Sequence, residues 1–173
     1  MTDPMEAPDR DMIRSVRAQA ADLLGDTVAL RRTLHEWPEL GNELPITRDR
    51  VLESLEGLPL AVTTHESTSG VVALLEGSKP GPTILLRGDM DALPMPEDTG
   101  LDFASHVDGC MHACGHDTHT AMLSSAARVL SDRRDDLAGR VLFMFLARNA
   151  RSPTEFFGIP PNQVVELGAQ IEL

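Results

Sequence analysis

The segment Met111–Ala121, which reads MHACGHDTHTA, constrains the fold of this chain more than any other feature. It places one thiol, three imidazoles and one carboxylate between His112 and Thr120. Neither an ordinary core nor an ordinary surface needs such a density of metal-binding groups. The segment therefore indicates a metal site close to the start of a helix.

A second polar cluster lies upstream, in the segment Arg87–Pro94. A strand-like run of residues, 83–86, leads directly into Asp89 and Asp91. Carboxylates at a strand end, followed by a Cys/His cluster at a helix start, are typical of a site at the carboxyl edge of an α/β sheet.

The hydrophobic pattern predicts the surrounding elements. One long helix is expected over 11–37, where Gly25 can interrupt it, and a second over 46–55. A further helix should begin near Asp117 or Thr118, either of which can cap it. Strands are expected at 60–64, 71–75, 83–87 and 139–146, and an irregular loop at 94–109. The last helix should bury a stripe made of Met122, Ala126, Val129 and Leu130. This order predicts an α/β fold with a mixed or parallel sheet and helices packed on it.

Composition excludes several classes of function. The 173 residues suit about one domain. The net charge of −12 argues against nucleic acid or an anionic membrane as a partner. No apolar run is long enough for a membrane span, and the first residues lack the features of a secretory signal, so a cytoplasmic location is expected. In that compartment the two cysteines indicate metal binding or catalysis before a disulfide.

The spacing within the Cys/His cluster suits a transition metal. Cys114 and His116 are two residues apart, so in an extended segment both can reach one ion. His116 and His119 share one face of a helix. Thiolate and imidazole ligands favour zinc, manganese, cobalt or nickel over calcium or magnesium. Asp89 and Asp91 alternate along their strand, so one could face the ion while the other supports a ligand.

Other interpretations stay open at this point. The histidines could be scattered on a loop around a buried cysteine. Alternatively, Cys110, Cys114, His116 and His119 could form a closed structural zinc site, although this would leave the nearby carboxylates unexplained. His35 is interpreted as structural, and Cys110 as a small buried residue.

Several segments together resemble the amidohydrolase branch of the aminoacylase and carboxypeptidase metallopeptidases, which includes hippurate hydrolases, N-acyl-amino-acid amidohydrolases and auxin-conjugate hydrolases. The matching segments lie in the family's order, at 32–40, 70–73, 81–94 and 111–121. The resemblance implies a site for two divalent ions. In it, Cys114 matches a bridging thiolate, His116 a metal ligand and Asp91 the acid that orients the site. It assigns no role to His119.

The resemblance also implies a substrate and a missing group. The family hydrolyses amide bonds of N-acyl amino acids or small peptides, and a glutamate moves the proton. In the family, the strand matching 141–145 runs into a Gln-Pro-Ala-Glu-Glu turn, whereas here residues 146–150 contain no carboxylate. Glu155 is the nearest candidate for a replacement.

The resemblance further predicts how the chain is divided. We expect a mobile tail over 1–9, an incomplete catalytic domain over 10–146 and a divergent tail over 147–173, the pattern that a truncated or frameshifted gene would produce. We also expect self-association and little activity of the chain alone. The alternative is a non-catalytic metal-binding or interaction protein derived from such an enzyme.

Overall fold

The computed structural model describes residues 9–147 and 164–166. Residues 1–8 of the predicted tail over 1–9, Glu155 and most of the segment after Ala147 lie outside the described residues. The predicted division of the chain therefore stays a prediction. The described elements are α1 (Arg10–Asp22), α2 (Leu24–Glu36), α3 (Pro45–Leu55), β1 (Ala61–His65), β2 (Thr68–Glu76), β3 (Lys79–Asp89), α4 (His116–Asp132), a 3₁₀ turn (Arg134–Asp136), β4 (Ala138–Leu146) and β5 (Val164–Glu166).

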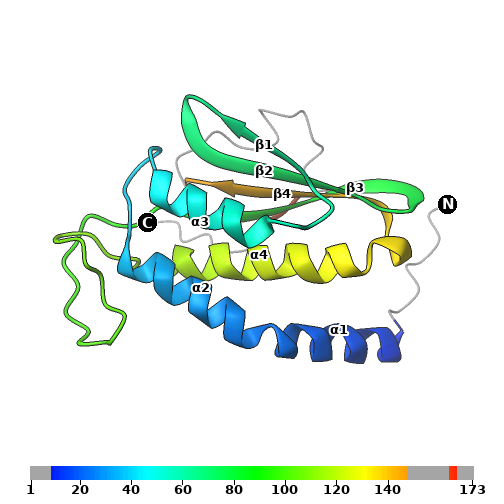
Figure 1. Cartoon of the computed structure of the whole chain (residues 1–173), viewed down its shortest axis with the longest axis horizontal. Helices are drawn as coiled ribbons and strands as arrows, with labels where there is room; N and C mark the ends of the chain where they lie inside the picture. The colour runs from blue at the N-terminus through cyan, green and yellow to red at the C-terminus, as the bar shows by residue number, and fades with distance from the viewer. Residues whose placement is uncertain (1–8, 148–163, 167–173) are drawn as a thin grey trace.

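The strands form one mixed sheet in the order β1-β2-β4-β3-β5 (Figure 1). β1 pairs with β2, and β2 with β4, in antiparallel fashion. β3 pairs in parallel with both β4 and β5. The mixed α/β fold is therefore confirmed, and β4 lies in the middle of the sheet.

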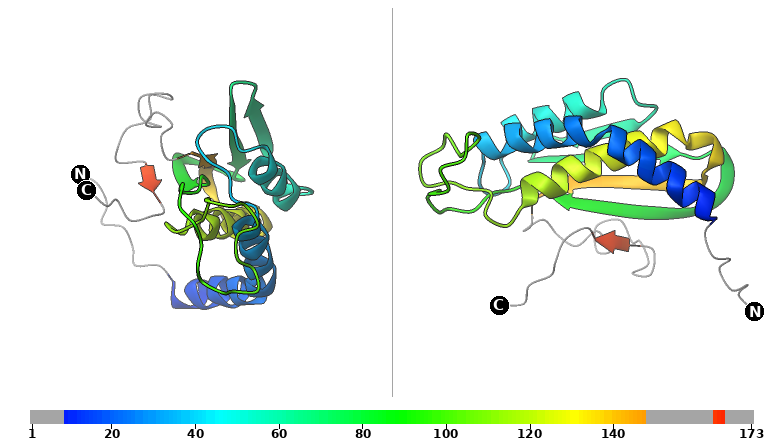
Figure 2. Two further views of the ribbon diagram at one scale, coloured as in Figure 1. Left: turned by 90° about the vertical axis from the view of Figure 1, so that its left-hand side faces the viewer. Right: turned by 90° about the horizontal axis from the view of Figure 1, so that it is seen from below.

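The described helices lie on one side of the sheet, in two layers (Figures 1 and 2). α3 and α4 pack directly on the strands, and α1 and α2 cover the outer side of α4. Alternate strand residues face α3 and α4, because successive side chains in a strand point to opposite faces. The core between these layers includes Val71, Ala73, Leu75, Phe143 and Phe145 from the strands and Val51, Leu55, Leu123 and Ala127 from the helices.

The expected elements appear with small differences in their bounds. The helix over 46–55 and the strands are confirmed, and no helix or strand occurs within 94–109. The long N-terminal helix is interrupted at Leu23 rather than at Gly25, which lies inside α2. Within the described part of the chain, no helix is both long and apolar enough to cross a membrane.

The predictions for α4 need two corrections. Its N-cap is Gly115, with φ 79°, and neither Asp117 nor Thr118 caps it. Met122 is 50% exposed, whereas the neighbouring Leu123 is fully buried. The buried face of α4 also contains Asp117, Thr120 and Ser124. Hydrophobicity alone assigns such polar residues to the solvent, so the predicted buried face differs from the observed one. Of the four residues predicted to be buried, only Val129 is buried.

Candidate metal centre

The two polar clusters of the sequence meet where α4 begins beside the end of β3. The Thr120 hydroxyl donates a hydrogen bond to the backbone oxygen of Asp89, at 3.1 Å. A Cβ atom at Gly88 would lie 3.1 Å from the backbone oxygen of His119. Glycine therefore lets α4 approach β3 closely, and this contact brings the strand-end carboxylates to the first turn of the helix.

His116 is held in a fixed orientation by Asp91. Its Nδ1 lies 2.7 Å from the backbone oxygen of Asp91 and 3.3 Å from the Oδ1 atom. The other ring nitrogen, Nε2, lies 4.0 Å from Oδ2 of Asp89. Burial opposes protonation of His116, but hydrogen bonds to Asp91 and the charges of Asp91 and Asp89 outweigh it and raise the pKa. The orienting role of Asp91 in a reaction stays a prediction.

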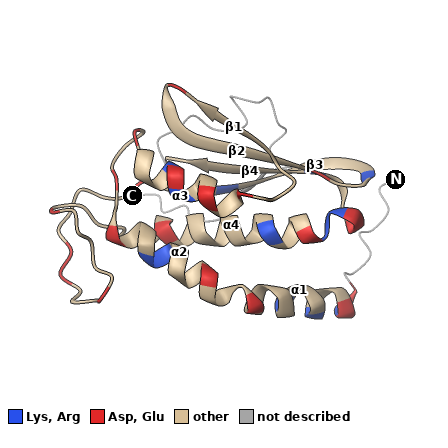
Figure 3. Ribbon diagram, viewed as in Figure 1, with Lys and Arg blue, Asp and Glu red and all other residues tan. Residues whose placement is uncertain are grey.

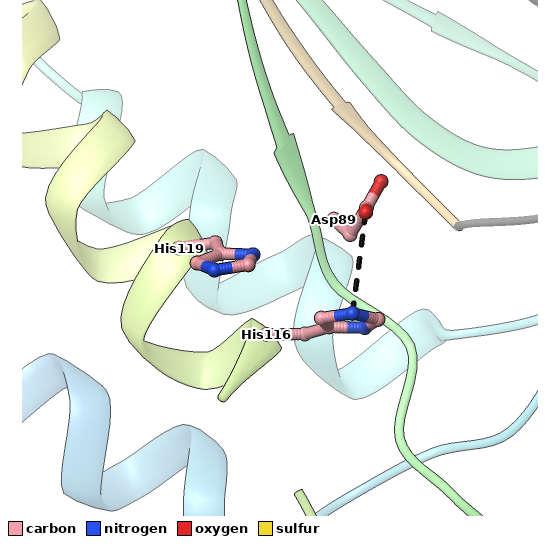
Figure 4. A group of neighbouring side chains, drawn as sticks. All are labelled: Asp89, His116 and His119. Carbon is pink, nitrogen blue, oxygen red and sulfur yellow. Dashed lines mark ion pairs between the residues drawn. The ribbon is translucent and has the colours of Figure 1, made fainter. Parts of the chain in front are cut away.

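His119 joins these residues, although the family resemblance assigned it no role. Asp89, His116 and His119 each offer one ligand atom, and these atoms lie within 4.8 Å of one another (Figure 4). Nδ1 of His119 is buried and has no hydrogen-bond partner. Burial, together with the charge of His116, lowers the pKa of His119. Such a group of carboxylate and neutral imidazole can hold a divalent transition metal.

The two cysteines differ in their surroundings. Cys114 is exposed and directly precedes the N-cap of α4. Cys110 is buried, and its Sγ lies 3.5 Å from the backbone oxygen of Pro38. Burial, and then the charge of Glu39, raises the pKa of the Cys110 thiol. Neither cysteine belongs to the group of ligand atoms found among the described residues.

The loop between β3 and α4 is acidic (Figure 3). Between Asp89 and His116 the chain has no Lys or Arg, whereas it contains Asp91, Glu97, Asp98, Asp102 and Asp108. This charge distribution favours the approach of a cation to that end of the sheet.

A buried ion-pair network lies beside the candidate metal centre. Oδ2 of Asp117 lies 2.7 Å from Nε of Arg31 and 2.7 Å from Nδ1 of His35. Nε2 of His35 lies 3.2 Å from Oε1 of Glu97. The network connects α4, α2 and the loop over 94–109, in agreement with the structural interpretation of His35. The sequence indicated Asp117 only as a candidate helix cap and did not predict its place in this network.

His112 is a buried side chain without hydrogen-bond partners. It is 4% exposed, and neither of its ring nitrogens has a partner among the described residues. Burial lowers the pKa of His112 to about 4, although the charge of Asp117 acts in the opposite direction. Its ring lies 6.2 Å from that of His35, between centroids. His112 is therefore neutral at pH 7 and lies next to the ion-pair network.

The chain is similar to several known proteins. Residues 85–148 match the model of Peptidase family M20/M25/M40. The chain is 40% identical over 136 residues to thermostable carboxypeptidase 1 of Saccharolobus solfataricus, covering 78% of this chain and 35% of that protein. It is 42% identical over 120 residues to the N-acyl-L-amino acid amidohydrolase of Geobacillus stearothermophilus, covering 69% and 32%.

A solved structure agrees with these relatives. The Bacillus subtilis YXEP protein, described as a dinuclear metal binding peptidase from the M20 family, superimposes with a TM-score of 0.67 and 41% identity. The match covers 75% of this chain and 35% of that one. The chain is therefore similar to members of the M20 peptidase family. It spans about a third of the length of these relatives and matches their N-terminal part.

A second family model overlaps the first. Residues 124–173 match a model described as K+ potassium transporter C-terminal domain. The overlap, residues 124–148, contains most of α4 and all of β4, which belong to the sheet and helix layers described above. The rest of this match falls outside the described residues, apart from β5.

Proposed function

We propose that this chain carries the metal-binding part of an M20-type amidohydrolase site, which acts on N-acyl amino acids or small peptides. The observation that carries the proposal is the fixed orientation of His116, whose Nδ1 is bound by Asp91 while Nε2 is directed toward Asp89. The names of the M20 relatives, an amidohydrolase and a carboxypeptidase, support the substrate class.

The residues present fit a divalent metal ion. In this proposal Cys114 and His116 are ligands, and Asp91 fixes the ring of His116 so that one nitrogen faces the ion. Exposure makes the Cys114 thiol, which lies next to the start of α4, accessible to an ion. Zinc, manganese, cobalt and nickel all suit this donor set. When bound, the metal supplies Lewis acidity toward a water and the amide carbonyl.

The sequence directly after β4 offers no group for proton transfer. Residues 147–150, which follow β4, contain no carboxylate. A positioned general acid–base contributes about 10²–10⁴-fold to a rate. We therefore propose that the 173-residue chain binds metal but hydrolyses these substrates slowly. The same observation favours a second candidate function, a non-catalytic metal-binding protein derived from such an enzyme.

Metal content and turnover test the proposal together. Cys114→Ser should sharply reduce the zinc or manganese bound per chain, while Cys110→Ser should leave it nearly unchanged. Equal losses from both substitutions would favour a structural zinc site, and no metal uptake by the wild type would overturn the proposal.

Turnover separates the two candidate functions. The chain is assayed on N-acetyl and N-benzoyl amino acids with zinc, manganese and cobalt. Slow turnover that vanishes in Cys114→Ser supports the amidohydrolase, and metal uptake without turnover supports the binding protein. A turnover near one per second, well within the range of ordinary enzymes, would contradict the predicted slow hydrolysis.

A further inference from the structure

We infer that the free edge of β1, together with the groove between β1 and α3, binds an extended peptide segment of a partner protein that carries apolar and basic side chains. The bound segment adds a strand to the sheet beside β1. This inference is independent of the proposed metal binding, because β2 and β4 separate β1 from β3. At about 4.8 Å per strand, β1 lies about 14 Å from β3.

β1 leaves one side of its backbone open to a further strand (Figure 1). It is the first strand of the sheet and, among the described strands, pairs with β2 alone. All residues of β1, Ala61–His65, are exposed. Edge strands are usually protected by charged side chains, proline or a bulge, but residues 61–64 contain no charge and no proline and pair regularly with β2. A register shift follows between Thr64 and His65, so residues 61–64 form the available edge.

The groove beside this edge has an apolar floor. It has a volume of about 570 Å³, and its apolar lining consists of Leu52, Leu55, Leu58 and Val62. Val62 pairs with the buried Ala73, so its side chain faces the helix side of the sheet, and it is 41% exposed. A strand added beside β1 would place alternate side chains on this same side, next to Val62.

Carboxylates surround the apolar floor. Asp49, Glu53 and Glu56 line the groove, and none of its described lining residues is Lys or Arg. Asp49 contacts Arg48, and Glu53 contacts Arg50, in exposed pairs that stabilise little. Glu56 makes no ion pair in the described part of the chain. A lysine of a bound peptide can therefore place its stem over the apolar floor and its ammonium group among these carboxylates.

The same charges argue against a second copy of this chain as the occupant. Two copies joined through β1 would bring their grooves together by two-fold symmetry. Each groove would then present its carboxylates to those of the other, with no basic lining residue to pair with them. The net charge of −12 adds to this repulsion, whereas it attracts a basic segment of another protein.

Fluorescence anisotropy of a labelled peptide measures binding to the full chain. The probe is Thr-Lys-Thr-Val-Thr-Lys-Thr, in which the lysines and the valine share one side of an extended strand. The control peptide has glutamate in place of both lysines. We expect the lysine peptide to bind at least about tenfold more tightly. Equal affinities, or no binding of the lysine peptide, would overturn the inference.

Backbone methylation tests whether the peptide binds as a strand. Successive N–H groups of a strand point to opposite edges, so N-methylation of every second residue blocks one edge and leaves the other free. Two methylated probes cover the two sets of residues. One should lose affinity at least about tenfold, and the other should bind like the unmodified probe. Equal effects of the two sets would show that no strand is added to the sheet.

Val62→Arg places a bulky charge in the groove, and Thr63→Arg is its matched control. Thr63 pairs with Val72, so its side chain lies on the opposite face of the sheet from that of Val62. We expect Val62→Arg to weaken probe binding at least about tenfold and Thr63→Arg at most about twofold. Far-UV circular dichroism checks the fold of both variants.

The carboxylates are tested by a pair of double variants with the same change of charge. Asp49→Asn with Glu56→Gln should weaken probe binding about fivefold at low ionic strength. Asp98→Asn with Asp108→Asn, in the exposed loop before α4, should leave it unchanged. Equal effects of the two double variants would mean that only the net charge of the chain attracts the probe, and the groove would lose its role.

Amide hydrogen exchange of the wild type gives a measurement without substitutions. The probe should slow exchange in residues 61–65 and leave α1 unchanged. No slowing in β1 would overturn the inference. Probe binding should also be the same with EDTA. If EDTA abolished it, the peptide would lie at the candidate metal centre, and the inference would be wrong while the proposed function stood.

Analytical ultracentrifugation tests the remaining occupant. If the chain dimerises and Val62→Arg makes it monomeric, a second copy occupies the edge of β1 and the inference is wrong. An oligomeric state that Val62→Arg leaves unchanged, with probe binding lost, supports the partner segment.

Discussion

His116 and Asp117 are neighbours in the first turn of α4, yet they belong to two polar clusters of different construction. Asp117 lies in what we call the closed network, where its Oδ2 contacts both Arg31 and His35 at 2.7 Å, while its Oδ1 is buried without a hydrogen-bond partner among the described residues. His116 lies in an open group, where its Nε2 is 4.0 Å from the Asp89 carboxylate and Nδ1 of His119 has no partner. The short contacts through one Asp117 oxygen tie three segments of the chain together, whereas the wider spacing of the open group is what a binding site for an ion requires.

The helix explains how both clusters fit at one place. Consecutive residues of a helix point about 100° apart, so His116 can face β3 while Asp117 faces α2. The closed network holds α2, α4 and the loop over 94–109 together. We interpret it as the rigid support from which the metal-binding side chains extend.

The largest expected effect is on stability, from Asp117→Asn. This change keeps the size of the side chain but removes the charge shared by Arg31 and His35. Because Asp117 is fully buried, we expect the free energy of unfolding to fall by about 3–5 kcal/mol. Asp89→Asn should cost about 1 kcal/mol or less, since Asp89 is only partly buried. Urea denaturation of both variants without metal measures the difference.

The exposed ion pair of Arg50 with Glu53 provides the control for Asp117→Asn. Both of its side chains are largely exposed, so Glu53→Gln should change stability by about 0.5 kcal/mol or less. If Asp117→Asn and Asp89→Asn lowered the free energy of unfolding equally, the two clusters would contribute equally to stability and the comparison would fail.

The next largest effect concerns the pH dependence caused by His112. Its pKa is about 4 when folded and 6.5 as a model value, so between these values the unfolded chain binds the proton more readily. The contribution of His112 to stability is therefore complete above pH 6.5 and lost as the pH falls toward 4, by up to about 3 kcal/mol. His112→Leu should remove this part of the pH dependence.

Urea midpoints at pH 7.5 and 4.5 measure the effect of His112. At pH 7.5 the variant should be about as stable as the wild type, because the leucine side chain has no unpartnered nitrogens. The other histidines remain in both proteins, so the difference between their pH profiles isolates His112. Parallel profiles would show that His112 is accessible to protons in the folded state.

The sequence predicts that the end of β3 meets the start of α4, but it does not predict the contacts of His119 and Asp117. A strand leading into Asp89 and Asp91, followed by a helix start near Asp117 or Thr118, indicated that these groups would meet, because both patterns are local. The proximity of His119 to Asp89 depends on the close approach of α4 to β3 at Gly88. The Asp117 network depends on contacts with Arg31 and Glu97, which are distant in sequence. Neither follows from spacing along the chain.

The smallest expected effect on the free energy of unfolding comes from substitution of Gly115, which precedes His116 and Asp117. Gly115 has φ 79° at the N-cap of α4, and no atom lies within 4 Å of a Cβ built there. Substitution therefore meets no steric neighbour, and its cost is purely conformational. Gly115→Ala should lower the free energy of unfolding by about 1–2 kcal/mol, and Gly115→Asn should cost less, because asparagine tolerates this conformation better.

Gly25→Ala is the matched control for Gly115→Ala. Gly25 lies in α2, also with no atom within 4 Å of a built Cβ, but without a positive φ. Alanine should therefore stabilise α2, by up to about 1 kcal/mol. The two Gly→Ala changes should shift thermal melting in opposite directions. If Gly115→Ala also stabilised the chain, the left-handed turn would not be needed to direct His116 and Asp117 to their separate clusters.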